Sequence, residues 1–342
     1  MSNAIHHPWD VPPAEGEPIE IARNILWIRL PLPMALDHVN VYALDDGDGW
    51  TLVDTGMSSR KTKTIWAKLI AGPLAGKPVR RLIVTHHHPD HIGLAGWFQA
   101  KGVELITTRT AWLYARMLVL DEQAVPTAES LLFYQRAGVD AEMRAVKAAE
   151  RPFNFSDVVD VMPQGFTRIA EGDVLTAGGR RWLVRLGQGH APDHATLWSM
   201  DDHLIIGGDQ LLPSISANIG VYPTEPDADP LGEWLDSTRG FAPFARLDHL
   251  VLPGHKLPFT GLPFRLIQMA ENHESALLRL LTHLKTPHTA AQCFVPLFKR
   301  EIIGSQHGLA LVEALAHLNY LLKRGSVSRF LDADGAWVWQ AG

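Results

Sequence analysis

The feature that most constrains this chain is a cluster of four histidines and one aspartate within residues 85–91, Thr-His-His-His-Pro-Asp-His. An apolar run at residues 79–84, interrupted by two arginines, precedes the cluster and predicts a strand. Residues 92–98 predict the start of a helix. The turn between them gathers many imidazole nitrogens and a carboxylate, which are donors that Zn²⁺ and similar divalent ions take.

The spacing within this cluster predicts two neighbouring metal positions. His86 and His88 can point to one side of the loop, and Asp90 and His91 to another. The alternatives are a chance cluster of histidines and the remnant of an affinity tag. A tag is disfavoured because the cluster lies well inside the chain, directly after a predicted strand.

The motif H-x-H-x-D-H, formed here by His86, His88, Asp90 and His91, resembles that of the metallo-β-lactamase superfamily. Further motifs of that family follow in order, and the resemblance covers roughly residues 20–265. It implies an α/β fold, the αβ/βα sandwich of the superfamily, with metal ions at one edge between two sheets. It also implies a cofactor of two divalent ions, Zn²⁺ in the first place, with Mn²⁺ or Fe²⁺ as alternatives.

The same resemblance implies seven metal ligands. The first metal would bind His86, His88 and His190. The second would bind Asp90, His91 and His255, and Asp209 would bridge the two. Asp90 is also expected to act in catalysis, by orienting the attacking hydroxide and relaying a proton to the leaving group.

Two residues are expected to support the ligands rather than to bind metal. Asp54 matches an aspartate that holds the metal loop by hydrogen bonds, although it could simply cap a helix. His194 is expected to orient a ligand. Around it, the family element G-H-[ST]-x-G-H is altered, with Ala191 where a hydroxyl is usual and Asp193 where glycine is usual.

The residue at position 209 separates two branches of the family. Zinc β-lactamases with the usual dinuclear site carry cysteine there, whereas this chain has Asp209. The sequence therefore favours the hydrolase branch with a carboxylate-bridged metal pair over an antibiotic-degrading enzyme.

The hydrophobic pattern predicts three parts of the chain. They are an N-terminal arm at residues 1–20, a metallo-β-lactamase-fold domain at 21–263 with a helical insertion at about 110–150, and a C-terminal domain at 264–342. The insertion is either a lid over the site or ordinary packing. The C-terminal part predicts helices at 264–284, 289–298 and 309–323 and a hairpin at 327–331 and 336–340, which resembles a winged-helix domain.

Bulk properties fit a globular enzyme. The net charge of −6 argues against broad, nonspecific nucleic-acid binding. The single cysteine, Cys293, excludes an intramolecular disulfide and suits a reducing compartment. No run of 18 apolar residues and no signal-like N-terminus occurs, so a cytoplasmic location without a membrane partner is expected.

The first functional expectation is a dinuclear hydrolase that uses metal-bound hydroxide on a small-molecule thioester or related ester. It rests on resemblance to type II glyoxalases and acyl-thioester hydrolases. Tyr222 is a candidate substrate contact, with packing as the alternative. The C-terminal domain could instead cover the pocket or form a homodimer contact.

Other activities stay open from the sequence alone. A metal-dependent endoribonuclease is suggested by the C-terminal domain, which has seven basic and four acidic residues from Arg279 onward. A lactonase and a mononuclear-iron persulfide dioxygenase share the fold. The complete ligand set disfavours both the mononuclear enzyme and a non-catalytic binding protein.

Overall fold

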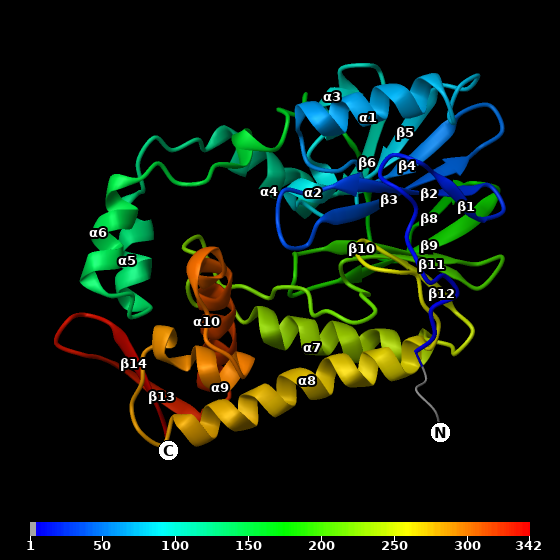
Figure 1. Ribbon diagram of the computed structural model, residues 1–342. Coiled ribbons are helices and arrows are strands. Elements are labelled where there is room, and N and C mark those ends of the chain that lie inside the picture. The colour runs from blue at the N-terminus through cyan, green and yellow to red at the C-terminus, as the bar shows by residue number, and fades with distance from the viewer. Residues whose placement is uncertain (1–4) are drawn as a thin grey trace. The chain divides into compact units, whose positions relative to one another are not determined.

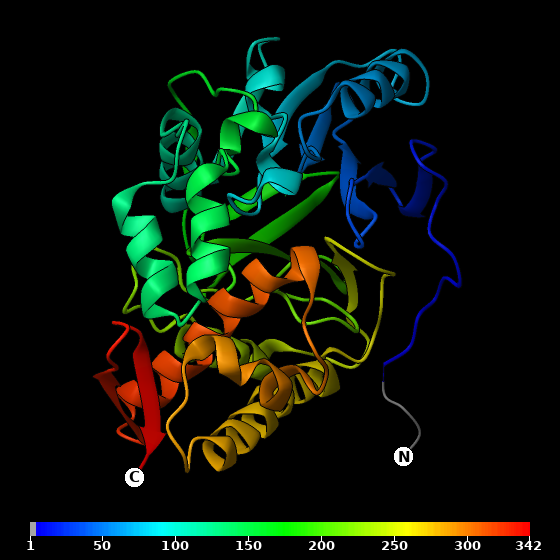
Figure 2. The same cartoon turned by 60° about the vertical axis from the view of Figure 1, so that its left-hand side comes forward.

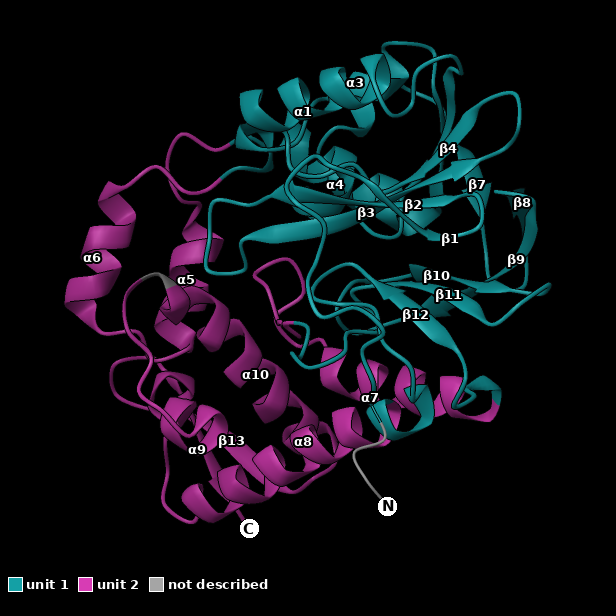
Figure 3. Cartoon of the chain, turned by 45° about the vertical axis from the view of Figure 1, so that its right-hand side comes forward, with its two compact units in different colours: residues 1–122, 154–217, 244–265 teal, residues 123–153, 218–243, 266–342 magenta. Residues whose placement is uncertain are grey.

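A computed structural model describes residues 5–342, so residues 1–4 of the expected N-terminal arm lie outside it (Figure 1). The chain divides into two compact units (Figure 3). The first comprises residues 1–122, 154–217 and 244–265, and the second comprises residues 123–153, 218–243 and 266–342. This division by compactness differs from the expected domain boundaries, which stay a prediction.

The first unit contains a seven-stranded sheet in which the strands follow in chain order. Strands β1 to β4 pair in antiparallel fashion, and β4 to β7 pair in parallel. The strands are β1 (Ile19–Ala22), β2 (Ile25–Pro31), β3 (His38–Asp45), β4 (Trp50–Val53), β5 (Val79–Ile83), β6 (Glu104–Thr108) and β7 (Thr167–Ile169).

A five-stranded sheet in the same unit has the order β12-β11-β10-β9-β8. Only β11 and β12 pair in parallel. Its strands are β8 (Val174–Ala177), β9 (Arg180–Gly187), β10 (His194–Ser199), β11 (Leu204–Gly208) and β12 (Leu250–Pro253).

Two hydrophobic clusters hold these layers together. One joins the seven-stranded sheet to helices, with Trp66 of α1 and Phe98 of α3 against strand residues such as Leu52. The other fills the space between the sheets, where Trp27 and Trp182 come from opposite sides. The unit is therefore a sandwich of two sheets with helices on one outer face. Its helices are α1 (Arg60–Ala71), α2 (Pro89–Ile92), α3 (Ala95–Gln99), α4 (Arg109–Leu120) and the short η1 (Phe155–Asp157).

The second unit is mainly helical and ends in a hairpin packed beside α10 (Figure 2). Within it, α5 and α6 contact each other, and Gln135 and Arg136 of α5 donate hydrogen bonds to carbonyls of the hairpin turn. Its elements are α5 (Ala128–Arg136), α6 (Ala141–Ala149), α7 (Pro230–Phe241), most of α8 (Leu262–His283), η3 (Ala290–Cys293), α9 (Phe294–Phe298), η4 (Gly304–Gln306), α10 (His307–Lys323), β13 (Val327–Leu331) and β14 (Trp337–Ala341). A further short helix, η2 (Ala242–Phe244), has residues assigned to both units, because the division along the chain falls after residue 243.

Most expected elements are confirmed, including the helical character of residues 110–150 and the final hairpin. Three details differ. The last two residues of the expected arm, 19 and 20, belong to β1. The helix expected to start within residues 92–98 is the short α3 (Ala95–Gln99), and residues 289–298 are split into η3 and α9. Among the described residues, no helix is both long and apolar enough to cross a membrane.

Candidate metal centre

Parallel pairing of β4 with β5 places Asp54 beside the histidine loop. The register aligns Val53 with Ile83, the last residues of the two strands. The carboxylate of Asp54 accepts hydrogen bonds from the backbone N–H of Thr85 at 2.8 Å and from its hydroxyl at 2.9 Å. It also accepts one from Nδ1 of His91 at 2.7 Å. Asp54 therefore ties the two ends of the loop to one carboxylate.

The second sheet delivers Asp209 and His255 in the same way. Strands β11 and β12 are parallel, and the register aligns Gly208 with Pro253. The backbone N–H of Gly254 donates to the carbonyl of Gly208 at 2.8 Å, which keeps the two strand ends together. A Cβ at Gly254 would lie 2.3 Å from Oδ1 of Asp209, so this close approach requires glycine.

Three imidazoles form the first candidate metal position. Nε2 of His86 lies 3.0 Å from Nδ1 of His88, which lies 3.0 Å from Nε2 of His190. His190 reaches this point from the loop between β9 and β10. The hydroxyl of Thr85 donates to Asp54 and lies 3.0 Å from Nδ1 of His86. The hydroxyl therefore accepts a hydrogen bond from that Nδ1, which leaves Nε2 of His86 as the nitrogen that faces the cluster.

The second candidate position combines Asp90, His91 and His255. Oδ2 of Asp90 lies 3.2 Å from Nε2 of His255 and 3.5 Å from Nε2 of His91. Nδ1 of His255 donates to the backbone carbonyl of His38 at 2.7 Å, just as Nδ1 of His91 donates to Asp54. In both rings Nδ1 donates to a fixed acceptor, so Nε2 is the nitrogen that would bind a metal ion.

Asp209 lies between the two groups. Its Oδ1 is 3.4 Å from Nε2 of His91, and its Oδ2 is 3.2 Å from Nε2 of His255 and 3.5 Å from Nε2 of His190. One carboxylate thus reaches a histidine of each group. The structure therefore brings all seven expected ligand side chains together, in three overlapping clusters of metal-ligand type.

The electrostatics of the two groups differ. Burial, reinforced by neighbouring histidines, lowers the pKa of His86 and His88 well below 6.5, so both rings are neutral at pH 7. Burial also acts to lower the pKa of His255, but the carboxylates of Asp209 and Asp90 outweigh it and raise that pKa to about 10. The first group therefore offers neutral ligands, and the second stabilises a positive charge.

The residues present fit a divalent metal ion. Within the described part of the chain, Nε2 of His91 and Oδ1 of Asp209 are buried and have no hydrogen-bond partner. Such atoms are costly unless something satisfies them. A cation bound between imidazole nitrogens and carboxylate oxygens satisfies both, and this donor set suits Zn²⁺, Mn²⁺ or Fe²⁺.

His194 supports the backbone of Asp209. Its Nε2 accepts a hydrogen bond from the N–H of Asp209 at 3.1 Å, and its ring stacks on His86 with centroids 4.4 Å apart. A Cβ at Gly208 would lie 2.5 Å from Cε1 of His194. His194 is therefore placed to orient neighbouring groups, and its expected supporting role stays a proposal.

The altered loop around His190 has its own hydrogen bonds. Asp193 has a positive φ of 50°, where glycine is usual in the family. Its carboxylate accepts hydrogen bonds from the hydroxyl of Thr110 and, at 2.9 Å, from Nε2 of Gln188. Its backbone N–H donates to Oε1 of Gln188 at 2.9 Å. These contacts hold the loop where the family would use a flexible glycine.

The expected substrate contact stays untested, and three residues beside the centre were not predicted from the sequence. Tyr222 lies in the second unit with 45% of its surface exposed, and its role as a substrate contact stays a prediction. The sequence reasoning missed Thr85, His38 and Asn40, although all three are buried beside the centre. A signal existed, because Asn40 is a polar residue within an otherwise largely apolar run at residues 39–44, which directly follows His38.

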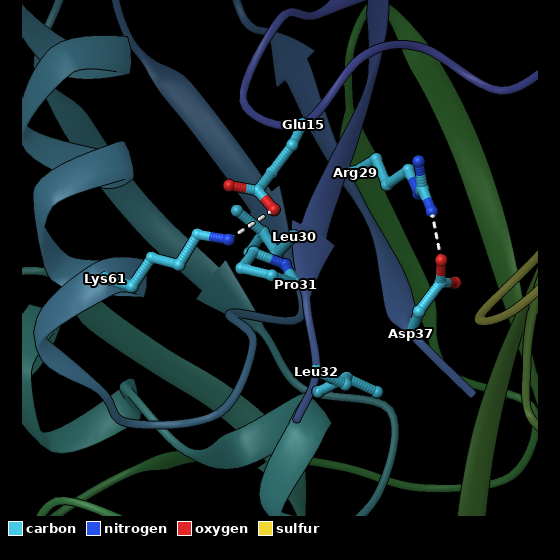
Figure 4. A pocket seen from close by; sticks show the side chains of 7 residues that line it. All are labelled: Glu15, Arg29, Leu30, Pro31, Leu32, Asp37 and Lys61. Carbon is cyan, nitrogen blue, oxygen red and sulfur yellow. Dashed lines mark hydrogen bonds and ion pairs between the residues drawn. The ribbon is translucent and has the colours of Figure 1, made fainter. Parts of the chain in front are cut away.

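A separate pocket of about 400 Å³ lies near the start of β3 (Figure 4). Lys61 pairs with Glu15 at 2.7 Å, and Arg29 pairs with Asp37 at 2.8 Å. The charges of these four lining residues balance, and none of the expected metal ligands lines the pocket.

Comparison with known proteins identifies the family. The sequence model of the metallo-beta-lactamase superfamily matches residues 34–255, which include all seven expected ligands. The chain belongs to this superfamily. Residues 277–342 also match the metallo-beta-lactamase-like C-terminal domain. The expected fold class and the expected enzyme class, a metal-dependent hydrolase, are thereby confirmed, whereas the winged-helix likeness stays a prediction.

Relatives of this superfamily member match over nearly the whole chain. The crystal structure of a beta-lactamase domain protein from Burkholderia ambifaria is 34% identical, with a TM-score of 0.89 over 99% of this chain and 97% of that one. The metallo-beta-lactamase family protein TTHA1429 from Thermus thermophilus is 26% identical, with a TM-score of 0.78 over 94% and 100%. The probable metallo-hydrolase YqjP of Bacillus subtilis (strain 168) is 26% identical over 326 residues, 91% of this chain and 96% of the relative.

Proposed function

We propose that this chain is a dinuclear metal-dependent hydrolase that acts on a small-molecule thioester or related ester. The position of Asp209 carries the proposal. Its two oxygens lie within 3.5 Å of Nε2 of His190 and 3.4 Å of Nε2 of His91, which belong to different groups. A carboxylate in this position suits a ligand shared by two metal ions.

The chain would hold one ion through His86, His88 and His190 and the other through Asp90, His91 and His255. Two divalent ions bound there would lower the pKa of a water molecule between them and polarise the carbonyl oxygen under attack. The chain's own contribution is to fix the ligands, because Asp54, Thr85 and the carbonyl of His38 hold the tautomers of three imidazoles.

Asp90 is the proposed catalytic carboxylate. Its side chain is 18% exposed, whereas that of Asp209 is 9% exposed, so Asp90 is more open to solvent and substrate. From this position it would accept a proton from the attacking water and pass it to the leaving group. Asp90→Asn should lower kcat at least about 100-fold while both ions remain bound. Unchanged turnover at full metal occupancy would contradict this role of Asp90.

An endoribonuclease is the second candidate, and the structure lends it little support. Several basic residues of the C-terminal part make contacts within the second unit. Arg324 pairs with Asp229 at 2.8 Å, and Arg329 pairs with Asp227 at 3.2 Å. Arg279 donates hydrogen bonds to two backbone carbonyls. These groups are engaged in holding the unit together rather than being displayed for phosphate contacts.

A thiol-release assay tests the substrate class directly. The lone Cys293 is fully buried, and burial raises the pKa of its thiol to about 12, so the enzyme adds little background to a thiol reagent. A buried free cysteine also suits the proposed cytoplasmic location. We would measure thiol release from a panel of acyl-CoA and acylglutathione thioesters, with the metal content of each sample determined in parallel.

Fast release that a chelator abolishes, from protein carrying two ions, would support the proposal and rank the acyl groups. No release from protein with two ions would contradict the thioester assignment and direct the search to lactones and RNA. A single ion per chain would contradict the dinuclear centre and favour mononuclear chemistry such as that of an iron dioxygenase.

A further inference from the structure

Three alternate residues of β3 point from the seven-stranded sheet to the loop that carries His255. Side chains two apart on a strand share a face, so His38, Asn40 and Tyr42 form a row. All three are buried, with exposures of 6%, 1% and 2%. A row of polar side chains at the interface between two sheets is unusual unless each is hydrogen-bonded. Each of them contacts the short segment Pro253–Lys256.

Asn40 makes the most contacts with this segment. Its Nδ2 donates to the carbonyl of Pro253 at 3.0 Å and to that of Lys256 at 2.8 Å. Its backbone N–H donates to the carbonyl of Gly254 at 2.7 Å. Its Oδ1 accepts from Nε1 of Trp27 at 2.9 Å, which fixes the orientation of the amide. One residue thus holds the backbone on both sides of His255.

His38 and Tyr42 complete the row. The backbone carbonyl of His38 accepts from Nδ1 of His255 at 2.7 Å, and its ring Nε2 accepts from the N–H of Lys256 at 3.2 Å. Nδ1 of His38 therefore carries the proton and donates to the carboxylate of Asp37 at 2.6 Å. The hydroxyl of Tyr42 donates to the carbonyl of Pro253 at 2.8 Å.

The segment needs such support because its own backbone is strained. Lys256 has a positive φ of 67°, which costs free energy in a residue with a side chain. Strained conformations persist where surrounding contacts enforce them. Within the segment, the carbonyls of Pro253, Gly254 and Lys256 are all held by β3. The position of the His255 ring is therefore set by the opposite sheet.

We propose that the row His38, Asn40 and Tyr42 positions His255 and so sets the affinity of the second metal site, the one formed with Asp90 and His91. None of the three is a metal ligand in this proposal. His86 of the first site is held instead through Thr85 and Asp54, so we expect that site to depend less on the row. The inference rests on the proposed dinuclear centre.

The test compares metal binding in Asn40→Ala and Tyr42→Phe with wild type. Zn²⁺ is removed by dialysis against a chelator and returned in a competitive titration, and bound ions are counted by elemental analysis. Loss of a group that orients a metal ligand typically weakens binding about 10–100-fold. We expect a loss of that size for one ion only in Asn40→Ala, and a smaller selective loss in Tyr42→Phe, which removes a single hydroxyl and keeps the ring.

Asn319→Ala is the matched control. Asn319 is also buried, and its Nδ2 also donates to two carbonyls, those of Pro226 at 3.0 Å and Ala228 at 2.9 Å, but within the second unit. It should lower the melting temperature and leave both metal affinities unchanged.

The outcomes separate the inference from the function on which it rests. The inference alone would be overturned if wild type binds two ions but the variants of the row bind both ions as tightly as wild type. Equal weakening of both ions in those variants would overturn it too. Selective loss of one ion in Asn319→Ala as well would also overturn it. A wild-type count of one ion would overturn the dinuclear centre and the inference with it.

Discussion

Nδ1 of His91 donates a hydrogen bond over 2.7 Å to Oδ2 of Asp54, and both side chains are almost wholly buried. The same oxygen accepts from the hydroxyl of Thr85, and that hydroxyl in turn accepts from Nδ1 of His86. One carboxylate therefore fixes the tautomer of one histidine in each candidate metal position.

Asp54→Asn should weaken both metal sites about 10–100-fold, because one acceptor oxygen becomes an NH₂ group that faces another donor. Asparagine tolerates the positive φ of 63° at this position, so the backbone itself is not strained by the change. A chelator competition with Zn²⁺ measures the effect. Asp46→Asn is the control, since Asp46 also accepts three hydrogen bonds, from Thr51, Arg81 and Gly178, but none from a candidate ligand. Equal metal affinity in Asp54→Asn and wild type would contradict the assignment.

Gly208→Ala should disturb the centre without touching a ligand. An added Cβ would lie 2.5 Å from Cε1 of His194 and 2.7 Å from its Nε2, and the positive φ of 49° disfavours a side chain. We expect a loss of about 1–3 kcal/mol in stability and weaker metal binding, because His194 holds the N–H of Asp209. Thermal unfolding and metal titration would measure both effects. Gly240→Ala in α7 has open space around it and should be neutral or slightly stabilising. Similar behaviour of the two variants would show that the close approach at Gly208 has no consequence.

Asp193 offers a test of the altered family loop. Asp193→Ala keeps a Cβ at a positive φ and removes the hydrogen bonds from Thr110 and Gln188, whereas Asp193→Gly removes the same bonds but relieves the strain. Both variants should weaken metal binding at the site of His190. The alanine variant should be less stable than the glycine variant by about 1 kcal/mol. Unfolding curves and Zn²⁺ affinity report the two effects separately. If both variants match wild type in affinity, the hydrogen bonds of Asp193 do not hold His190.

We predict that the stability of the protein depends on pH through Glu313 of the second unit. Burial raises the pKa of its carboxyl from a usual value of 4.5 to about 7, although a hydrogen bond from Asn218 opposes this. The folded state therefore keeps the proton more readily than the unfolded state. The stabilising contribution of Glu313 to the free energy of unfolding is fully present below pH 4.5. It is lost as the pH rises through about 7, and the total loss is roughly 3 kcal/mol.

Glu313→Gln should remove this dependence and give a higher melting temperature than wild type at pH 8. Metal-free samples should be compared between about pH 5 and pH 8, since metal binding is itself pH-dependent. Glu301→Gln, at an exposed position, should follow wild type. Parallel melting curves for Glu313→Gln and wild type across this range would contradict the prediction.

Local pattern was enough to predict much of the fold. The strand β5 coincides with a largely apolar run of sequence, and the long helices α8 and α10 carry apolar residues at helical spacing. Short or polar elements were harder to predict from the sequence. The strand β7 has only three residues, Thr167–Ile169, and forms because β6 offers it a parallel edge. The helix expected to start within residues 92–98 is short, since α3 spans only Ala95–Gln99 and follows a separate short helix, α2, that ends at Ile92.

The sequence by itself determined the chemistry of the candidate site. His86, His88, Asp90 and His91 lie within six residues, so the covalent chain alone keeps their donors close, and the family resemblance added His190, Asp209 and His255. Only the tertiary structure decided how these donors are held. The carbonyl of His38 meets Nδ1 of His255 across 217 residues of sequence, and Asn40 reaches Pro253 across 213. Such contacts depend on the register within and between two sheets, which is set by the packing of the whole unit and not by any local pattern.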